Sequence, residues 1–206
     1  MQRPDMMIKG KEFAMNSPVG IFDSGVGGLT VTREIMRQLP GENLIYFGDT
    51  ARVPYGSKSK DTIIKYSKQI ARFLMTKDVK AIVIACNTAS ALALDELQAE
   101  FDIPIIGVIE PGAITAAETT RNNNIGIIGT KATIQSGVYN EYLRKINPQI
   151  TVVSKACPLF VPLVEENFIE DRVTEDIVSR YLHEIKEYGV DSLILGCTHY
   201  PLIRHV

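Results

Sequence analysis

Two cysteines stand where thiol acid/base chemistry could occur. Cys86 and Cys197 each end a short apolar run and are followed by polar residues, in the segments AIVIACNTASA (81–91) and SLILGCTHYPL (192–202). A thiolate can accept a proton and a thiol can donate one. A lone buried cysteine is usually a small apolar core residue. Two cysteines in matching settings favour a pair of opposed acid/base thiols instead.

Each of these cysteines is expected to close a buried strand and to precede a helix directly. In parallel α/β sheets, ligands bind beyond the carboxyl ends of the strands. The first turn of the following helix offers free N–H groups and a positive dipole end. We therefore expect this setting to lower the pKa of both thiols, because only the thiolate gains from those donors. The third cysteine, Cys157, precedes Pro158, and we interpret it as structural.

A glycine-rich segment, DSGVGG (23–28), follows the first expected strand. Its glycines allow the backbone to approach a ligand closely, and Asp23 and Ser24 can face that ligand. A helix N-cap is the structural alternative for these two residues. A dinucleotide-binding loop is less favoured, because Thr30 stands where the GxGxxG pattern requires its third glycine.

Three further positions are candidates on weaker grounds. Tyr55 and Gly56 lie in a proline-containing loop, GDTARVPYGSKS (48–59), and loops between a strand and a helix often carry binding residues. His199 could protonate a leaving group, stabilise a thiolate or cap a helix. Glu165 is ambiguous, since a carboxylate is most often solvated.

Short apolar runs alternate with longer amphipathic patterns along the whole chain. Strands buried on both faces and separated by helices predict βαβ units and an α/β fold with mainly parallel sheets. The expected strands cover residues 19–23, 43–47, 81–85, 105–108, 124–128, 150–154 and 192–196. The expected helices cover residues 28–38, 60–77, 89–100, 111–120, 135–145 and 172–188.

The sequence repeats itself in outline. The two cysteine segments share the order strand, small residue, Cys, polar pair and helix start, and VGIFDSGVGG (19–28) matches IGIIGTKATI (125–134) in the same way. We therefore predict two pseudo-symmetric parallel-sheet α/β domains, 18–108 and 109–206, with the active site between them. Residues 1–17 are expected to form a loose N-terminal extension.

The composition argues against several classes of protein. With 22 Lys and Arg against 24 Asp and Glu, the chain lacks the basic surface of a nucleic-acid binder. Its apolar runs are too short for a membrane span or a signal peptide. Three widely spaced cysteines fit neither a disulfide framework nor a zinc site. We expect no metal, and a reducing cytoplasm as the compartment.

Six segments together resemble the glutamate racemases of the aspartate/glutamate racemase family. They occur in family order between residues 20 and 203, and they are GIFDSGVGGLTV, YFGDTARVPYGSKS, IACNTASA, PIIGVIEPG, IGIIGT and LGCTHYPLI. The resemblance implies interconversion of L- and D-glutamate without a cofactor, which supplies D-glutamate for peptidoglycan. Glutamate is then the expected small-molecule partner, with a homodimer as the candidate assembly.

The resemblance also implies a role for each candidate residue. Cys86 and Cys197 would stand on opposite faces of the substrate. Asp23 would assist the first thiol, and His199 with Glu165 would assist the second. The implied substrate-binding residues are Asp23, Ser24, Tyr55, Gly56, Asn87, Thr88, Thr130, Thr198 and His199.

One departure from the family pattern concerns the end of the sequence. Family members continue beyond CTHYPL with helices that return to complete the first half, whereas this sequence stops at Val206. We therefore expect a truncated chain whose activity is weak or absent. The alternatives are racemisation of aspartate or a related amino acid, and an inactive paralogue that binds glutamate without turnover. A nucleotide-dependent oxidoreductase is the least favoured.

Overall fold

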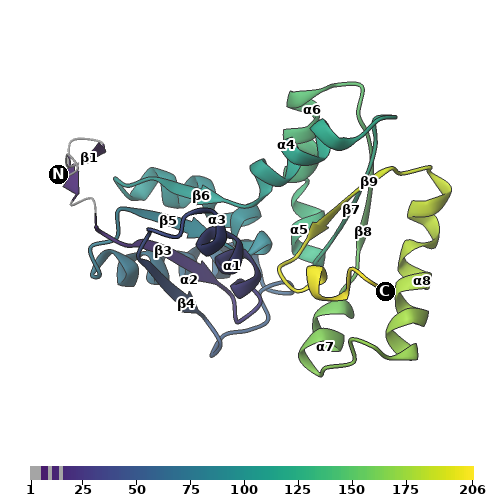
Figure 1. Ribbon diagram of the computed structural model, residues 1–206, viewed down its shortest axis with the longest axis horizontal. Coiled ribbons are helices and arrows are strands. Elements are labelled where there is room, and N and C mark those ends of the chain that lie inside the picture. The colour runs from purple at the N-terminus through teal and green to yellow at the C-terminus, as the bar shows by residue number, and fades with distance from the viewer. Residues whose placement is uncertain (1–5, 9–10, 14–15) are drawn as a thin grey trace. The chain divides into compact units, whose positions relative to one another are not determined.

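The computed structural model describes residues 6–8, 11–13 and 16–206 of the chain. They form two compact units, the first ending at Val108 and the second beginning at Ile109 (Figure 1). Each unit contains its own parallel sheet with helices alongside it, so the predicted α/β class with two parallel-sheet regions is confirmed. No helix in the described ranges is long and apolar enough to cross a membrane.

The sheet of the first unit has four parallel strands in the order β4-β3-β5-β6. Its strands are β3 (Val19–Asp23), β4 (Leu44–Gly48), β5 (Ala81–Ile84) and β6 (Ile105–Gly107). The strands alternate with α1 (Leu29–Gln38), α2 (Lys60–Met75) and α3 (Asn87–Glu100). This alternation is the βαβ arrangement that the apolar runs predict.

The core of the first unit lies between one face of this sheet and the helices α2 and α3. Phe22, Ile82 and Ile84 point from the strands into a cluster that also contains Ile70 of α2 and Leu97 of α3. The residue before helix α2 is Ser59, whose hydroxyl accepts a hydrogen bond from the Thr62 N–H at 3.3 Å. Such a cap replaces one backbone partner that the first turn lacks. The hydrogen bond at Ser59 therefore fixes the end of the loop that precedes α2.

A small antiparallel pair of strands, β1 (Met6–Ile8) and β2 (Lys11–Phe13), comes before β3 in the chain. We expected a loose extension over residues 1–17, and this pairing was not predicted. Strands of three residues are too short to show the period of two by which a strand is identified in sequence.

The sheet of the second unit has three parallel strands in the order β8-β7-β9. These are β7 (Asn124–Gly129), β8 (Thr151–Ala156) and β9 (Ser192–Gly196). The other elements are α4 (Ile109–Thr119), α5 (Lys131–Ser136), α6 (Val138–Ile146), α7 (Phe160–Glu165), α8 (Arg172–Glu187) and the 3-10 helix η1 (Tyr200–Ile203). Where one helix was expected over 135–145, Gly137 at φ +70° separates α5 from α6. A left-handed residue of this kind ends a helix, and glycine adopts it without strain.

The two sheets share one local pattern. In each, the strand that comes first in the chain lies between the second and the third. Asp23 of β3 lies opposite Gly48, and Gly129 of β7 lies opposite Ala156. The next backbone N–H after each partner strand, that of Asp49 or of Cys157, donates to the carbonyl oxygen of Asp23 or Gly129, at 3.0 and 2.9 Å. The two units thus end their central strands in the same way.

Candidate active site

The carboxyl edge of the first sheet brings together three buried polar side chains. Asp23 is the last residue of β3, Asp49 follows β4, and Cys86 lies two residues after β5. All three are buried. Because the strands are parallel, their carboxyl ends meet at one edge, which is where α/β folds bind ligands.

Cys86 caps the first turn of α3. Its Sγ accepts a hydrogen bond from the Ala89 N–H at 3.5 Å, and the side chain and backbone of Ser24 also interact with it. The side chain is only 5% exposed. Burial, followed by the nearby negative charge of Asp23, raises the pKa of the Cys86 thiol to about 11, although Ala89 and Ser24 act to lower it. The predicted lowering is therefore wrong for Cys86, because desolvation outweighs the donors at the helix start.

The DSGVGG turn is held against the strand next to it. The Gly25 N–H donates to Asp23 Oδ2 at 2.9 Å, and the hydroxyl of Tyr46 on β4 donates to the Gly25 carbonyl at 2.7 Å. A Cβ at Gly28 would lie 2.5 Å from the Asp23 Cβ. Gly28 is therefore needed because α1 begins directly against the Asp23 side chain. Ser24 lies within this turn and is partly exposed.

The loop that carries Tyr55 and Gly56 is anchored through a buried carboxylate. The Tyr55 hydroxyl donates to Asp49 Oδ2, and Arg52 Nε donates to Asp49 Oδ1 at 2.8 Å. The Arg52 guanidinium also lies 4.2 Å from the centre of the Tyr66 ring. Burial and Asp49 raise the pKa of Tyr55, so its hydroxyl stays protonated and remains a donor to Asp49. Tyr55 thus fixes the loop rather than exchanging protons.

Asn87 and Thr88 form the start of α3, directly after Cys86, and both are buried. Together with Asp23, Ser24, Tyr55 and Gly56 they complete the group of candidate residues that belong to the first unit. The backbone N–H groups at such a helix start are suited to hold a carboxylate.

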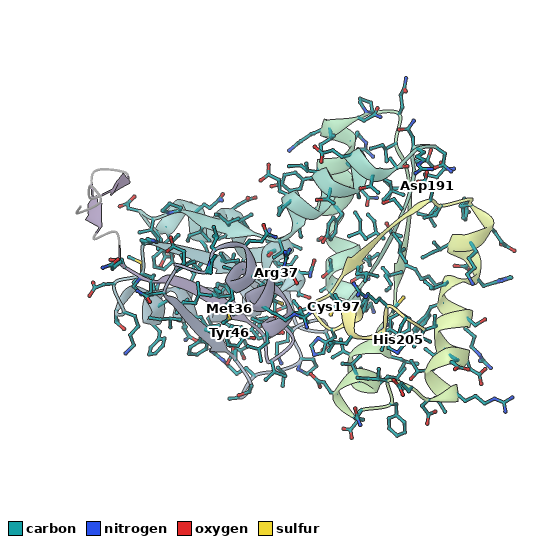
Figure 2. The ribbon with its side chains drawn as sticks, viewed as in Figure 1. Met36, Arg37, Tyr46, Asp191, Cys197 and His205 are labelled. Carbon is teal, nitrogen blue, oxygen red and sulfur yellow. The ribbon has the colours of Figure 1, made fainter. Side chains whose placement is uncertain are left out.

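The candidate residues of the second unit centre on Cys197, which follows β9 directly (Figure 2). The Cys197 Sγ lies 3.7 Å from His199 Nδ1, and His199 Nε2 lies 3.0 Å from Glu165 Oε1. Cys197, Thr198 and His199 are buried, whereas the Glu165 side chain is 45% exposed. A carboxylate bound to one imidazole nitrogen fixes which nitrogen faces the thiol. The three side chains therefore form one hydrogen-bonded chain from the thiol to the surface.

Thr130 is engaged at the start of α5. Its hydroxyl accepts a hydrogen bond from the Thr133 N–H at 3.2 Å and lies 3.0 Å from the Thr133 hydroxyl. This is the helix-capping role that Ser and Thr commonly have.

Cys157 lies in the core of the second unit. It is fully buried, and the Tyr200 hydroxyl donates to its carbonyl oxygen at 2.8 Å. Burial raises the pKa of its thiol to about 12. These surroundings fit the structural interpretation. In the part of the chain that the structure describes, no cluster of three or more His, Cys, Asp and Glu side chains could hold a metal ion.

Three residues of the site were not singled out from the sequence: Tyr46, Asp49 and Arg52. Asp49 and Arg52 are three residues apart in the GDTAR segment, and the spacing alone is compatible with an exposed turn. The informative feature is the burial of Asp49 beneath Tyr55, which depends on the folded loop. In the sequence, Tyr46 has the pattern of an ordinary strand residue. Its hydroxyl contacts Gly25 only once the turn has folded.

Comparisons with known proteins agree with the motifs. Residues 19–206 match the family model of Asp/Glu/hydantoin racemases. The chain is 56% identical to the glutamate racemase of Geobacter metallireducens over 188 residues, which is 91% of this chain and 70% of that protein. It is similar in structure to the glutamate racemase isoform RacE1 of Bacillus anthracis, with a TM-score of 0.89 and 43% identity over 92% of this chain and 71% of that one. It is also similar to the glutamate racemase of Francisella tularensis in complex with D-glutamate, with a TM-score of 0.87 and 46% identity over 92% of this chain and 72% of that one.

Proposed function

The chain belongs to the glutamate racemases of the Asp/Glu/hydantoin racemase family, and we propose that it interconverts L- and D-glutamate through the thiols of Cys86 and Cys197. The observation that carries the mechanism is the setting of the two cysteines. Each cysteine lies one residue beyond the position that pairs with the end of the central strand of its sheet, β3 or β7. Each also has its own charged or ionisable companion, Asp23 or His199. The D-glutamate complex of the Francisella tularensis relative supports the substrate.

Inversion at the α-carbon requires a base on one side and a proton donor on the other. In the proposed reaction one thiolate removes the α-proton, and the other group, as a thiol, delivers a proton to the opposite face. The reverse direction exchanges the two roles. Both proton transfers are thus assigned to cysteines, and the proposal needs no cofactor.

The α-hydrogen of an amino acid is very weakly acidic, so the developing negative charge must be stabilised. Fixed N–H donors do this without reorganisation. We assign this task to the start of α3 at Asn87 and Thr88 and to the turn at Ser24. Thr198 would serve in the same way in the second unit.

The raised pKa of Cys86 has a consequence for this mechanism. Without substrate, a thiol whose pKa is about 11 is almost entirely protonated at neutral pH. A substrate brings an α-ammonium group, and a positive charge near the sulfur favours the thiolate. We propose that substrate binding itself makes Cys86 competent as a base.

His199 is assigned to the second thiol. Its Nδ1 faces Cys197 Sγ, while Glu165 holds Nε2. An imidazole in this position stabilises the thiolate as it forms or supplies it with a proton. We further propose that the D-glutamate formed serves peptidoglycan synthesis, and that the reaction takes place in the cytoplasm, where thiols stay reduced.

The test is proton exchange in heavy water, starting from each pure enantiomer. The wild-type chain is expected to form the other enantiomer with deuterium at the α-carbon. Cys86→Ala and Cys197→Ala are each expected to abolish racemisation, whereas Cys157→Ala serves as the matched cysteine control and stays active. Near wild-type turnover in either catalytic variant would refute the two-thiol mechanism. A panel of other amino acids, aspartate included, with chiral detection tests the substrate.

A further inference from the structure

We propose that Tyr46 is a positioning residue for the first thiol, because its hydroxyl fixes the Asp23 carboxylate beside Cys86 through the backbone of Gly25. The inference rests on the proposed function, since it assigns to Tyr46 a part in the proton transfer at Cys86. Tyr46 lies on β4, opposite Ile21 of β3, and its side chain is half-buried (Figure 2).

The contact from Tyr46 to Asp23 passes through a single residue. The Tyr46 hydroxyl donates to the Gly25 carbonyl at 2.7 Å, and the Gly25 N–H donates to Asp23 Oδ2 at 2.9 Å. The Gly25 backbone is therefore bound on both sides. A hydrogen bond from a backbone N–H to an ionised carboxylate is stronger than one between neutral groups, so this contact orients Asp23.

Close packing keeps the turn in this position. A Cβ at Gly48 would overlap the Gly25 carbonyl oxygen, so β4 and the turn touch through their backbones. A Cβ at Gly28 would meet both Asp23, at 2.5 Å, and the Tyr46 hydroxyl oxygen, at 3.0 Å. The turn is thus packed between the Tyr46 hydroxyl and the Asp23 side chain, and it has little room to move.

The electrostatics explain why the position of Asp23 matters. Among the described residues, the titratable groups that interact with the Cys86 thiol include Asp23 from β3, Tyr46 from β4 and Tyr55 from the loop after β4. Burial raises the pKa of both tyrosines, so they are neutral at physiological pH. Asp23 supplies the negative charge, and its distance from the sulfur sets how strongly the thiol holds its proton.

The experiment removes only the hydroxyl, with Tyr46→Phe. The expected result is a kcat lowered about tenfold, because a displaced Asp23 no longer assists proton transfer at the Cys86 thiol. KM is expected to stay nearly unchanged, since the substrate contacts are kept. The matched control is Tyr181→Phe in the second unit, where a half-buried tyrosine hydroxyl also interacts with backbone, at Leu159. The control is expected to lose a similar few degrees of Tm and to keep its kcat. An unchanged kcat in Tyr46→Phe would overturn the proposal.

A second measurement follows the thiol itself and does not depend on turnover. With Cys157 and Cys197 both replaced by Ala, Cys86 is the only cysteine, and its alkylation by iodoacetamide reports the fraction of thiolate. Tyr46→Phe is expected to speed alkylation at pH 8 about tenfold, which corresponds to a pKa lower by about one pH unit. This measurement does not require the wild-type chain to racemise glutamate. A failure of the proposed function can therefore be told apart from a failure of the proposal for Tyr46.

A double-mutant cycle shows whether Tyr46 acts through Asp23. Asp23→Asn is expected to speed the alkylation of Cys86 by itself, because it removes the negative charge. Adding Tyr46→Phe to Asp23→Asn should then change the rate less than twofold. If Tyr46→Phe speeds alkylation as much in the Asp23→Asn background as alone, the hydroxyl acts on access to the thiol, and the proposal is wrong.

Discussion

Cys86 and Cys197 occupy equivalent positions in two separate parallel sheets. The last pair between β3 and β5 is Phe22 with Ile84, and continuing this register places Ala85 beside Asp23. The last pair between β7 and β9 is Gly129 with Gly196. Ala85 and Gly196 thus lie beside the last residues of the central strands β3 and β7. Each cysteine is the next residue in the chain. This shared position supports our proposal that the two halves are pseudo-symmetric. It also means that each thiol lies at the carboxyl edge of its own sheet.

The hydrogen bonds that link Cys197, His199 and Glu165 predict that substitutions farther from the thiol cost less activity. His199→Asn is expected to lower kcat about 10- to 100-fold, because the imidazole acts directly on the thiol. Glu165→Gln is expected to lower kcat less than about tenfold, since this half-exposed side chain only orients the imidazole and glutamine can still accept its hydrogen bond. Steady-state kinetics with each enantiomer check both values. A larger loss for Glu165→Gln than for His199→Asn would contradict this order.

Removing the Tyr55 hydroxyl should disturb binding more than chemistry. Tyr55→Phe leaves buried Asp49 with one donor fewer, which is expected to lower the free energy of unfolding by about 1–3 kcal/mol. The loop that contains Gly56 then loses its anchor, and KM is expected to rise several-fold while kcat changes little. Denaturant unfolding and steady-state kinetics measure the two effects. Tyr188→Phe, at an exposed tyrosine of the second unit, is the control and should change neither.

The contact between Gly28 and Asp23 predicts that a single methyl group is harmful. Gly28→Ala places a Cβ 2.5 Å from the Asp23 Cβ, so the turn or the start of α1 must move. We expect a loss of about 1–3 kcal/mol in the free energy of unfolding and at least tenfold in kcat. Gly41→Ala is a suitable control, because a Cβ there meets nothing within 4 Å. Equal behaviour of the two variants in unfolding and activity assays would exclude the steric explanation.

The raised pKa of the Cys157 thiol predicts that the stability of the fold depends on pH, independently of catalysis. Burial raises the pKa of its thiol from 9.0 to about 12, so the folded chain keeps the proton while the unfolded chain loses it. The stabilising contribution is therefore complete below pH 9 and is lost as the pH rises toward 12. Cys157→Ala should lower the free energy of unfolding at pH 7 by about 1–2 kcal/mol and make its decline above pH 9 less steep. Urea unfolding at several pH values measures this, and an unchanged slope would contradict it.

The strands were the part of the fold that the sequence predicted best. Val19–Asp23 and Ser192–Gly196 were predicted with the bounds that the structure has, because short, largely apolar runs of this length are typical of strands in parallel sheets. The break between α5 and α6 was not predicted, since the amphipathic pattern continues across Gly137. The helix α7 was missed as well. It has six residues, including Pro162, which is too short for a helical period to appear.

The candidate site was predicted by residue type but not by electrostatics. The motifs located Asp23, Cys86, Cys197 and His199, and within each unit the structure brings the expected neighbours together. The direction of the Cys86 pKa shift could not be predicted from the sequence, because it depends on how far Ala89 and Ser24 offset the effect of burial. The carboxylate of Asp49 was missed for a related reason. Its importance comes from being enclosed by Tyr55 and Arg52, and enclosure is a property of the folded loop.

The protonated state of Cys86 bears on how the protein withstands peroxide. The thiolate is the form that peroxide attacks, and its conversion to sulfinic or sulfonic acid is not reversed by ordinary thiols. Burial and Asp23 keep this sulfur protonated in the free chain. In the mechanism that we propose, the thiolate forms when a substrate brings its positive charge to the sulfur and also covers it. We therefore expect the Cys86 thiol to be oxidised more slowly in the free protein than in the complex in which it becomes a thiolate.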